Sequence, residues 1–185
     1  MPQSVHTVTL ACHPDCPTGA LQRIDARVVR TPAATLDITY VASGDIARLR
    51  VPARGAPRYA GRLWQHTCFE VFIRCGTAHA YHEFNFSPSG AWAAYAFERY
   101  REGAPLADPA LAPQASVSLR EDALELRAQL ELDRLSPQHA TGHLSLAVAA
   151  VIEDAEGTLA YWALRHPPGR PDFHHPDAYA LDIDD

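Results

Sequence analysis

The sequence predicts an all-β fold in which two antiparallel sheets pack face to face, a β-sandwich of the jelly-roll or immunoglobulin-like kind with about ten or more strands. Three observations predict it. Apolar residues alternate with polar ones along many short segments, prolines separate these segments, and turn-forming residues join several of them. The chain has 185 residues, which fits a single domain spanning 1–185, and 47% of them are hydrophobic, as in a protein with a packed core.

In chain order, strands are expected at residues 5–11, 24–30, 36–40, 47–51, 69–74, 83–87, 92–97, 116–119, 124–132, 144–152 and 158–164. The alternation is clearest at 36–40, 69–74, 83–87 and 124–132, where apolar residues occupy every second position. Because successive side chains of a strand point to opposite faces, each of these four segments should have one buried and one solvated face.

Turns and one short helix connect these strands. The stretch Ser87-Pro88-Ser89-Gly90 lies between two aromatic strands and predicts a hairpin. The helix is expected at 133–140, where Ser136 suits the N-cap and Pro137 the first helical position. Elsewhere the frequent prolines disfavour long helices, because proline removes a backbone donor and clashes with the preceding turn.

Composition excludes several classes of function. Acidic residues number 22 against 16 basic ones, giving a net charge of −6, and the basic residues, all arginine, are scattered along the chain. A nucleic-acid partner is therefore not expected, since phosphate binding needs a basic surface. The most apolar stretch, 144–152, is too short to cross a membrane. Residues 1–10 lack the features of a secretory signal, so we expect a cytoplasmic protein with reduced thiols.

Three segments together resemble a known family: LWQHTCFEVF at 63–72, YHEFNFSPSGAWAAY at 81–95 and HPPGRPDFHHP at 166–176. This combination resembles the DOMON-like domain group, which is related to the family 9 carbohydrate-binding modules, and the resemblance spans nearly the whole chain from residue 36 onward. It implies a β-sandwich that binds a ligand, a sugar in the carbohydrate modules and haem in the cytochrome relatives. It names no ligand for this branch of the group.

Two tryptophans are the first ligand-binding candidates. Trp64 lies just before a strand, and Trp92 lies inside one. Aromatic faces pack against the apolar patches of sugar rings, and in the sugar-binding relatives a pair of tryptophans clamps the ligand. The alternative for both is a role in the core or at a sheet edge, which suits Trp92 better because of its place in a strand.

Polar residues on two neighbouring aromatic strands are the next candidates. Glu70, Glu83 and Asn85 occupy the polar phase of their strands, and Arg101 follows the next strand and could pair with the acids. A sugar site needs a few fixed hydrogen-bonding groups beside its stacking surface. The alternatives are a solvated outer face for the three and a structural ion pair for Arg101.

The tail holds the densest group of polar residues. We expect Asp172 and His174 to line a ligand site, or the loop to close one end of the sandwich with Phe173 anchored in the core. His166, His174 and His175 could instead bind a divalent metal, although adjacent histidines point apart in an extended chain. The close spacing of Cys12, His13 and Cys16 is a weaker metal signal, because no second ligand pair follows it.

No cofactor and no catalytic residue are predicted. The sequence has no G-x-S-x-G elbow and no phosphate-binding glycine loop. Haem would need two histidine ligands, because Met1 is the only methionine, lysine is absent and no C-x-x-C-H motif occurs. Calcium is conceivable as a structural ion, but no acidic loop demands it.

The sequence therefore predicts a non-catalytic module for a small polar ligand, first of all a carbohydrate. Three observations carry this hypothesis: the tryptophans, the polar strand residues and the resemblance. The alternative is a metal- or haem-binding redox or enzymatic module that uses the histidine-rich tail. A third possibility is an interaction domain whose aromatic face contacts another protein.

Overall fold

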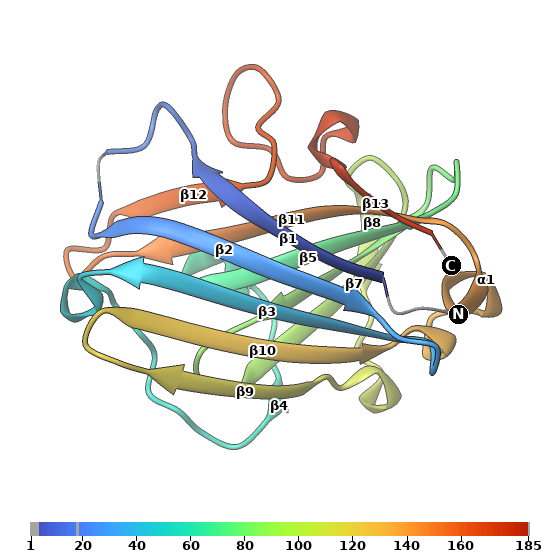
Figure 1. Ribbon diagram of the computed structural model, residues 1–185, viewed down its shortest axis with the longest axis horizontal. Helices are drawn as coiled ribbons and strands as arrows, with labels where there is room; N and C mark the ends of the chain where they lie inside the picture. The colour runs from blue at the N-terminus through green and yellow to red at the C-terminus, as the bar shows by residue number, and fades with distance from the viewer. Residues whose placement is uncertain (1–3, 18, 185) are drawn as a thin grey trace.

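The computed structural model describes residues 4–17 and 19–184 and shows a mostly β protein (Figure 1). Thirteen strands in this part of the chain form one continuous, strongly curled sheet. One half of the sheet contains, in spatial order, β1 (Ser4–Cys12), β2 (Leu21–Arg30), β3 (Thr35–Gly44), β10 (Ala123–Glu131) and β9 (Gln114–Leu119). The other half contains β12 (Leu159–Ala163), β11 (Leu144–Glu153), β5 (Cys68–Cys75), β6 (Tyr81–Phe86), β7 (Ala91–Arg99) and β4 (Arg58–Tyr59), with β13 (Leu181–Ile183) on β11 and β8 (Glu102–Pro105) on β7.

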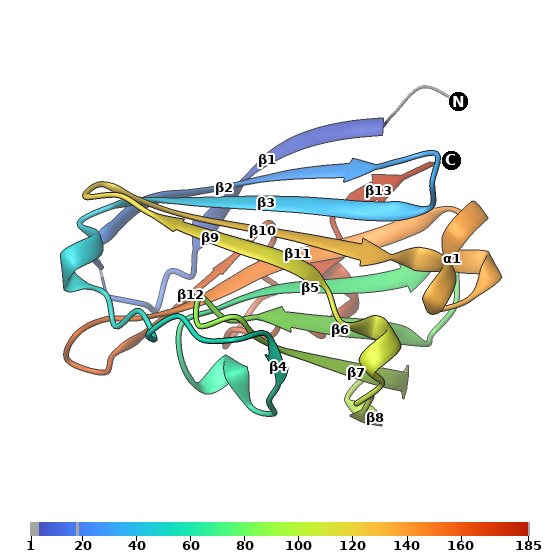
Figure 2. The same cartoon turned by 90° about the horizontal axis from the view of Figure 1, so that it is seen from below.

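The continuity of the sheet differs from the two separate sheets expected. Strand β1 pairs with β2 from Ser4 to Leu10, and its last residues, Ala11 and Cys12, pair with β12 instead. This change of partner bends the sheet over on itself, so the two halves face each other as layers (Figure 2). All strand pairs are antiparallel except β4 with β7, which makes the sheet mixed. Alternating hydrophobicity predicts strands, but it does not show where a strand changes partner.

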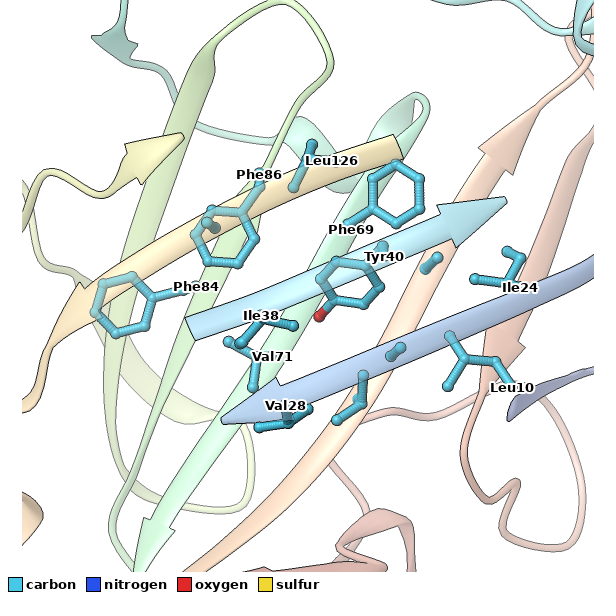
Figure 3. Close-up of a cluster of buried hydrophobic side chains, with 14 of the residues drawn as sticks. Leu10, Ile24, Val28, Ile38, Tyr40, Phe69, Val71, Phe84, Phe86 and Leu126 are labelled. Atoms are coloured by element: carbon cyan, nitrogen blue, oxygen red, sulfur yellow. The ribbon is translucent and has the colours of Figure 1, made fainter. Parts of the chain in front are cut away.

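The main core fills the space between the two halves. Fully buried Ile24, Ile38 and Tyr40 from one half meet Phe69 and Phe84 from the other (Figure 3). The Tyr40 hydroxyl donates a hydrogen bond of 2.8 Å to the carbonyl oxygen of Glu70 on β5 and so links the halves directly. These residues occupy the apolar phase of their strands, so the period-two pattern predicted this face correctly.

Most of the expected strands are present, with one error and three omissions. The predicted strand at 47–51 is wrong, because Ile46–Arg48 forms a 3₁₀ helix and Leu49 makes a single bridge to Asp154. Strands β4, β8 and β13 were not expected from the sequence, because they have two to four residues each and are too short to show alternation. The predicted helix at 133–140 is a 3₁₀ turn, Leu132–Arg134, followed by α1 (Pro137–Thr141).

Local turn chemistry was predicted correctly at two places. The Ser136 side chain accepts a hydrogen bond from the backbone N–H of His139 and caps α1, as expected. Residues 87–90 join β6 to β7: the Ser87 N–H donates to the Ala91 carbonyl over 2.9 Å, and Gly90 adopts a φ of 89°. Only glycine adopts this left-handed conformation without strain. The hairpin fixes the register of the two strands that carry most of the candidate site.

Strands β5 and β6 are buried on both faces, not on one as expected, and their neighbour β11 is buried on both faces as well. Their inner face packs into the main core, and their outer face carries a second cluster built around Phe72, Tyr81 and Phe173. Residues 164–180, here called the covering loop, lie over this outer face and include the 3₁₀ helix Pro176–Ala178 (Figure 1, top). No helix in the described part of the chain is long and apolar enough to cross a membrane.

Candidate functional site

A cavity of about 350 Å³ lies on the outer face of this half of the sheet, beside the covering loop. Five aromatic residues, four ionisable ones and two others line it: Trp64, Tyr95, Phe97, Tyr161 and Phe173; Glu70, Glu83, Arg101 and His174; and Val151 and Pro171. Five of the eight residues proposed from the sequence are therefore together on one cavity wall. Two more, Asn85 and Asp172, contact residues of the lining.

Strand register explains why the polar side chains converge. Glu70 on β5 lies directly opposite Asn85 on β6, and this row continues to Ala149 on β11 and Ala93 on β7. Opposite residues in antiparallel strands have Cβ atoms about 4.5–5.5 Å apart, so the two polar groups are neighbours. The small alanines at both ends of the row leave space above the sheet. Glu83 lies two residues before Asn85 on the same face of β6.

Glu70 is the most unusual group in the cavity. Its residue is 2% exposed, and its Oε1 atom has no hydrogen-bond partner among the described residues. Burial raises the pKa of this carboxyl well above its usual value, and the neighbouring Glu83 raises it further, while a hydrogen bond from the Cys68 thiol acts in the opposite direction. A carboxyl in such a position is held neutral until a positive or donor-rich group approaches it.

Glu83 has a partner but shares the same environment. The amide Nδ2 of Asn85 donates a 2.7 Å hydrogen bond to its Oε1 atom. Burial raises the pKa of Glu83 to about 7, against smaller lowering contributions from Asn85 and Arg101. Because the Asn85 nitrogen is used by Glu83, its buried Oδ1 is left as an acceptor, and this atom has no partner in the described structure. The unsatisfied atoms in this row are therefore all acceptors.

His174 reaches the cavity from the covering loop. Its Nδ1 atom lies 2.9 Å from the Tyr81 hydroxyl, which also accepts a 3.1 Å hydrogen bond from the backbone N–H of Arg101. The Tyr81 hydroxyl can therefore donate its own proton to Nδ1 of His174. In this arrangement the imidazole proton of His174 is on Nε2, which lies 3.7 Å from Glu83 Oε2. Burial lowers the pKa of His174 to about 4, with a further contribution from Arg101, so the contact with Glu83 is not an ion pair at neutral pH.

Arg101 and Asp172 fasten the covering loop to the end of β7. Arg101 adopts a φ of 59° and extends its guanidinium over 2.8 Å to Asp172 Oδ1. Asp172 also accepts hydrogen bonds from the Tyr100 hydroxyl and, over 3.1 Å, from the backbone N–H of His174. Although partial burial raises the pKa of Asp172, the bonds from Tyr100 and Arg101 bring it below its usual value. From the sequence, Arg101 could pair with the strand acids or form a structural ion pair; in the structure its ion-pair partner is Asp172.

The two tryptophans have opposite positions. Trp64 lies in the 3₁₀ helix Leu63–Gln65, lines the cavity and is 46% exposed. The preceding residue, Arg62, donates its backbone N–H to the Tyr95 hydroxyl over 3.2 Å, which ties this turn to β7. Trp92 does not join the site. It lies on the inner face of β7, buried in the main core with its ring edge-on to Tyr59 at 5.2 Å, because it has the opposite phase of the strand from Tyr95.

The histidines of the tail have separate partners. His166 bonds to the Ala11 carbonyl through Nε2 at 2.8 Å, and His175 accepts from the backbone N–H of Asp177. In residues 4–17 and 19–184, no three His, Cys, Asp or Glu side chains are grouped to hold a metal ion. Met1, which entered the haem argument, lies outside the described residues. The expected anchoring of Phe173 in a core is confirmed, in the second cluster.

Most of the aromatic residues that line the cavity were not predicted from the sequence. Tyr95, Phe97, Tyr161 and Phe173 line the cavity but were not among the candidates. Tyr95 and Phe97 do carry a signal, since they alternate with Ala94 and Ala96 on β7. Recognising that they share a face with Glu83 requires the β6–β7 register, in which Glu83 lies opposite Tyr95. Tyr161 and Phe173 come from remote segments and have no such signal.

Comparisons with known proteins inform the fold. No family model matches the sequence, and no curated protein matches it. Among solved structures, a Bacteroides uniformis ATCC 8492 protein for which carbohydrate binding has been proposed aligns with a TM-score of 0.68 and 15% identity, over 95% of this chain and 84% of that chain. A family 9 carbohydrate-binding module from Caldicellulosiruptor kristjanssonii, solved with cellotriose, aligns with a TM-score of 0.54 and 12% identity, over 89% of this chain and 75% of that chain. The chain therefore has a fold similar to that of a family 9 carbohydrate-binding module.

Proposed function

We propose that this chain is a non-catalytic module of the DOMON-like group that binds a small polar ligand, a carbohydrate, in the cavity on the outer face of β5, β6 and β7. One observation carries the proposal: an accessible indole, Trp64, lines the same cavity as the buried carboxyls of Glu70 and Glu83. Sugar rings have an apolar face and a hydroxyl edge, and they need both kinds of surface at once.

The size and composition of the cavity support this function. A volume of about 350 Å³ falls within the roughly 300–1,000 Å³ typical of small-ligand sites. Trp64 stacks against the ring, and Glu83, His174 and Arg101 supply hydrogen-bonding groups around it. Asn85 and Asp172 hold Glu83 and Arg101 in position and do not line the cavity themselves. The cellotriose complex of the family 9 module supports sugar binding by analogy.

Two earlier hypotheses receive no such support. A metal or haem module would use the histidines of the tail, but His166 and His175 are bound to separate backbone groups. An interaction domain would need an exposed aromatic face, whereas the aromatic residues here surround a cavity. In the proposed function the tail therefore serves as one wall of the sugar site, with His174 as its contribution.

The experiment is calorimetric titration of the full chain with a panel of mono- and disaccharides. Trp64→Ala should weaken binding by about tenfold, because aromatic stacking contributes about 0.5–1.5 kcal/mol and 1.4 kcal/mol corresponds to a factor of ten. Its melting temperature should change little, since the side chain is half exposed. The matched control is Leu119→Ala, a 55% exposed apolar residue on β9 in the other half of the sheet, which should leave binding unchanged. Sugar affinity that survives in Trp64→Ala contradicts the proposal.

A further inference from the structure

The polar floor of the cavity has more hydrogen-bond acceptors than donors. Glu70 Oε1 and Asn85 Oδ1 are buried without hydrogen-bond partners in the described part of the chain, and the two residues lie opposite each other on β5 and β6. Glu83, on the same face, offers its Oε2 atom, which lies 3.7 Å from His174 and beyond hydrogen-bond distance. A buried acceptor without a partner destabilises the folded protein. Two carboxyl acceptors of the lining, Glu70 Oε1 and Glu83 Oε2, thus face a space that a donor-rich group would fill, with the unpaired Asn85 Oδ1 next to them.

The charge of the cavity points in the same direction. Two carboxyl groups line it, and the guanidinium that lines it, that of Arg101, is engaged by Asp172 outside the lining. His174 does not supply a positive charge, because its burial favours the neutral ring. When the carboxyls of Glu70 and Glu83 ionise, the lining carries two negative charges against the single positive charge of Arg101, which already forms an ion pair with Asp172.

The aromatic walls complete the site. Trp64, Tyr95 and Phe97 line the cavity together with Tyr161 and Phe173. The face of an aromatic ring attracts a cation within about 6 Å, and Trp does so most strongly. Carboxylates combined with several aromatic rings form an environment that favours a positively charged organic group over a neutral one.

We propose that the ligand of this cavity carries an ammonium group, which binds against Glu70 and Glu83 while the rest of the ligand packs on Trp64. This inference rests on the proposed function and specifies its substrate class as an amino sugar with a free amine. An ammonium group has three donors and no acceptor, which suits the carboxyl oxygens that Glu70 and Glu83 present to the cavity. A sugar hydroxyl has one donor and brings acceptors of its own to a site that already has too many.

The test is calorimetric titration of the full chain at pH 7 with three sugars that share one ring: D-glucosamine, D-glucose and N-acetyl-D-glucosamine. We expect glucosamine to bind at least about tenfold more tightly than the other two, since charge-assisted hydrogen bonds are roughly twice as strong as neutral ones. Glu70→Gln and Glu83→Gln keep the shape of the side chain and remove its charge. Each should reduce the ratio of glucosamine affinity to glucose affinity at least about threefold relative to the wild type, whatever its effect on glucose binding itself.

The outcomes separate this inference from the proposed function. Equal binding of the three sugars, or a preference that survives in both glutamine variants, overturns the ammonium assignment and leaves carbohydrate binding intact. If no sugar binds, the proposed function fails, and tyramine, an aromatic amine without a sugar ring, becomes the deciding probe. Tyramine binding to the wild type that is lost in Glu70→Gln supports the ammonium site. If tyramine does not bind the wild type, the ammonium assignment is wrong. The wild-type comparison decides the question even where a variant does not fold.

Discussion

At the scale of single residues, the site is defined by the carboxyls of Glu70 and Glu83. Both are buried among aromatic side chains, where carboxyls are seldom found. The pKa of Glu83 is raised to about 7 because the covering loop and the aromatic side chains of the cavity shield its carboxyl from solvent. Buried acids normally have a cation or several donors beside them. Glu83 has one amide donor, from Asn85, and a neutral imidazole, from His174. The consequences can be measured through the dependence of stability on pH.

Glu83→Gln tests the raised pKa of this carboxyl. Between the usual value near 4.5 and the folded value near 7, the folded state binds more protons at Glu83 than the unfolded state does, so this group lowers stability as the pH rises through that window. Relative to wild type, Glu83→Gln should therefore gain stability from pH 5 to pH 8, by up to about 3 kcal/mol. Chemical denaturation at a series of pH values measures it. A difference that does not change with pH contradicts the buried, protonated carboxyl.

His174→Gln should show the opposite sign. The folded pKa near 4 lies below the unfolded value near 6.5, so the unfolded state binds the extra proton between these values and the wild type loses stability as the pH falls. The variant lacks this loss and should gain relative stability from pH 6.5 down to pH 4. The same denaturation series provides the measurement. A variant that instead becomes relatively less stable on acidification would mean that the imidazole is charged in the folded protein.

The sequence indicated five of the residues that line the cavity, for reasons that can be identified. Glu70 and Glu83 stood out because they occupy the polar phase of aromatic strands, and Trp64 because an indole just before a strand suits a loop that binds a sugar. Burial of the acids could not be predicted, since it depends on a loop that begins more than eighty residues after Glu83. The alternation places Trp92 and Tyr95 on opposite faces of β7, but it does not show which of these faces carries the cavity.

At the scale of elements, hydrogen bonds fasten the covering loop to several other parts of the molecule. Asp172 joins it to Arg101 and Tyr100, His174 joins it to Tyr81, and the carbonyl of Gly169 bonds to His13 over 2.9 Å. The first two connections lie next to the cavity. The position of this loop therefore decides both the shape of the site and the burial of its carboxyls.

Asp172→Ala should loosen this loop. The substitution removes an acceptor that serves Tyr100, Arg101 and the His174 backbone, and we expect a loss of about 1–2 kcal/mol in stability because Arg101 is half exposed. Ligand affinity should fall with it. Asp177→Ala, in the same loop but 65% exposed and near only His175, is the control and should change neither. Equal effects of the two substitutions, in thermal melts and titrations, would contradict this role for Asp172.

Element prediction succeeded where local chemistry determines the outcome. The Ser136 cap and the 87–90 turn depend on a few adjacent residues, and both form as expected. The segment 47–51 failed because its alternating apolar residues are used differently: Ile46 and Leu49 enter the core from a 3₁₀ turn. Tertiary packing decided that segment, and the covering loop has no periodic pattern from which its position could be read.

At the scale of the whole molecule, the two halves of the sheet are stabilised by their shared core and by one buried hydrogen bond, from Tyr40 to the Glu70 carbonyl. Tyr40→Phe removes that bond and should cost about 1 kcal/mol. Tyr59→Phe is a matched control, because the Tyr59 hydroxyl is buried without a partner in the described structure and its removal should be neutral or slightly stabilising. Urea denaturation compares the two. Similar losses for both would contradict a specific link through Tyr40.

The mostly β architecture with two facing layers was predicted from the sequence, but the joining of the layers into one sheet was not. Alternating strands with a shared apolar phase lead to two facing layers, and these layers are present. That they belong to one sheet depends on Ala11 and Cys12, whose pairing with β12 rather than β2 follows from the geometry of the folded chain. Nothing in the composition of these two residues distinguishes them from the rest of β1.

Strand β1 is hydrogen-bonded to β2 in one layer and to β12 in the other. Neither layer can therefore unfold without breaking hydrogen bonds to a strand that the other layer shares. A protein built from two detached sheets could lose one of them first, whereas here unfolding should be one concerted event, with the same midpoint by tryptophan fluorescence and by far-ultraviolet circular dichroism. Any ligand that binds over β5 and β6 would then raise the melting temperature of the entire chain, since its binding energy is shared through that common strand.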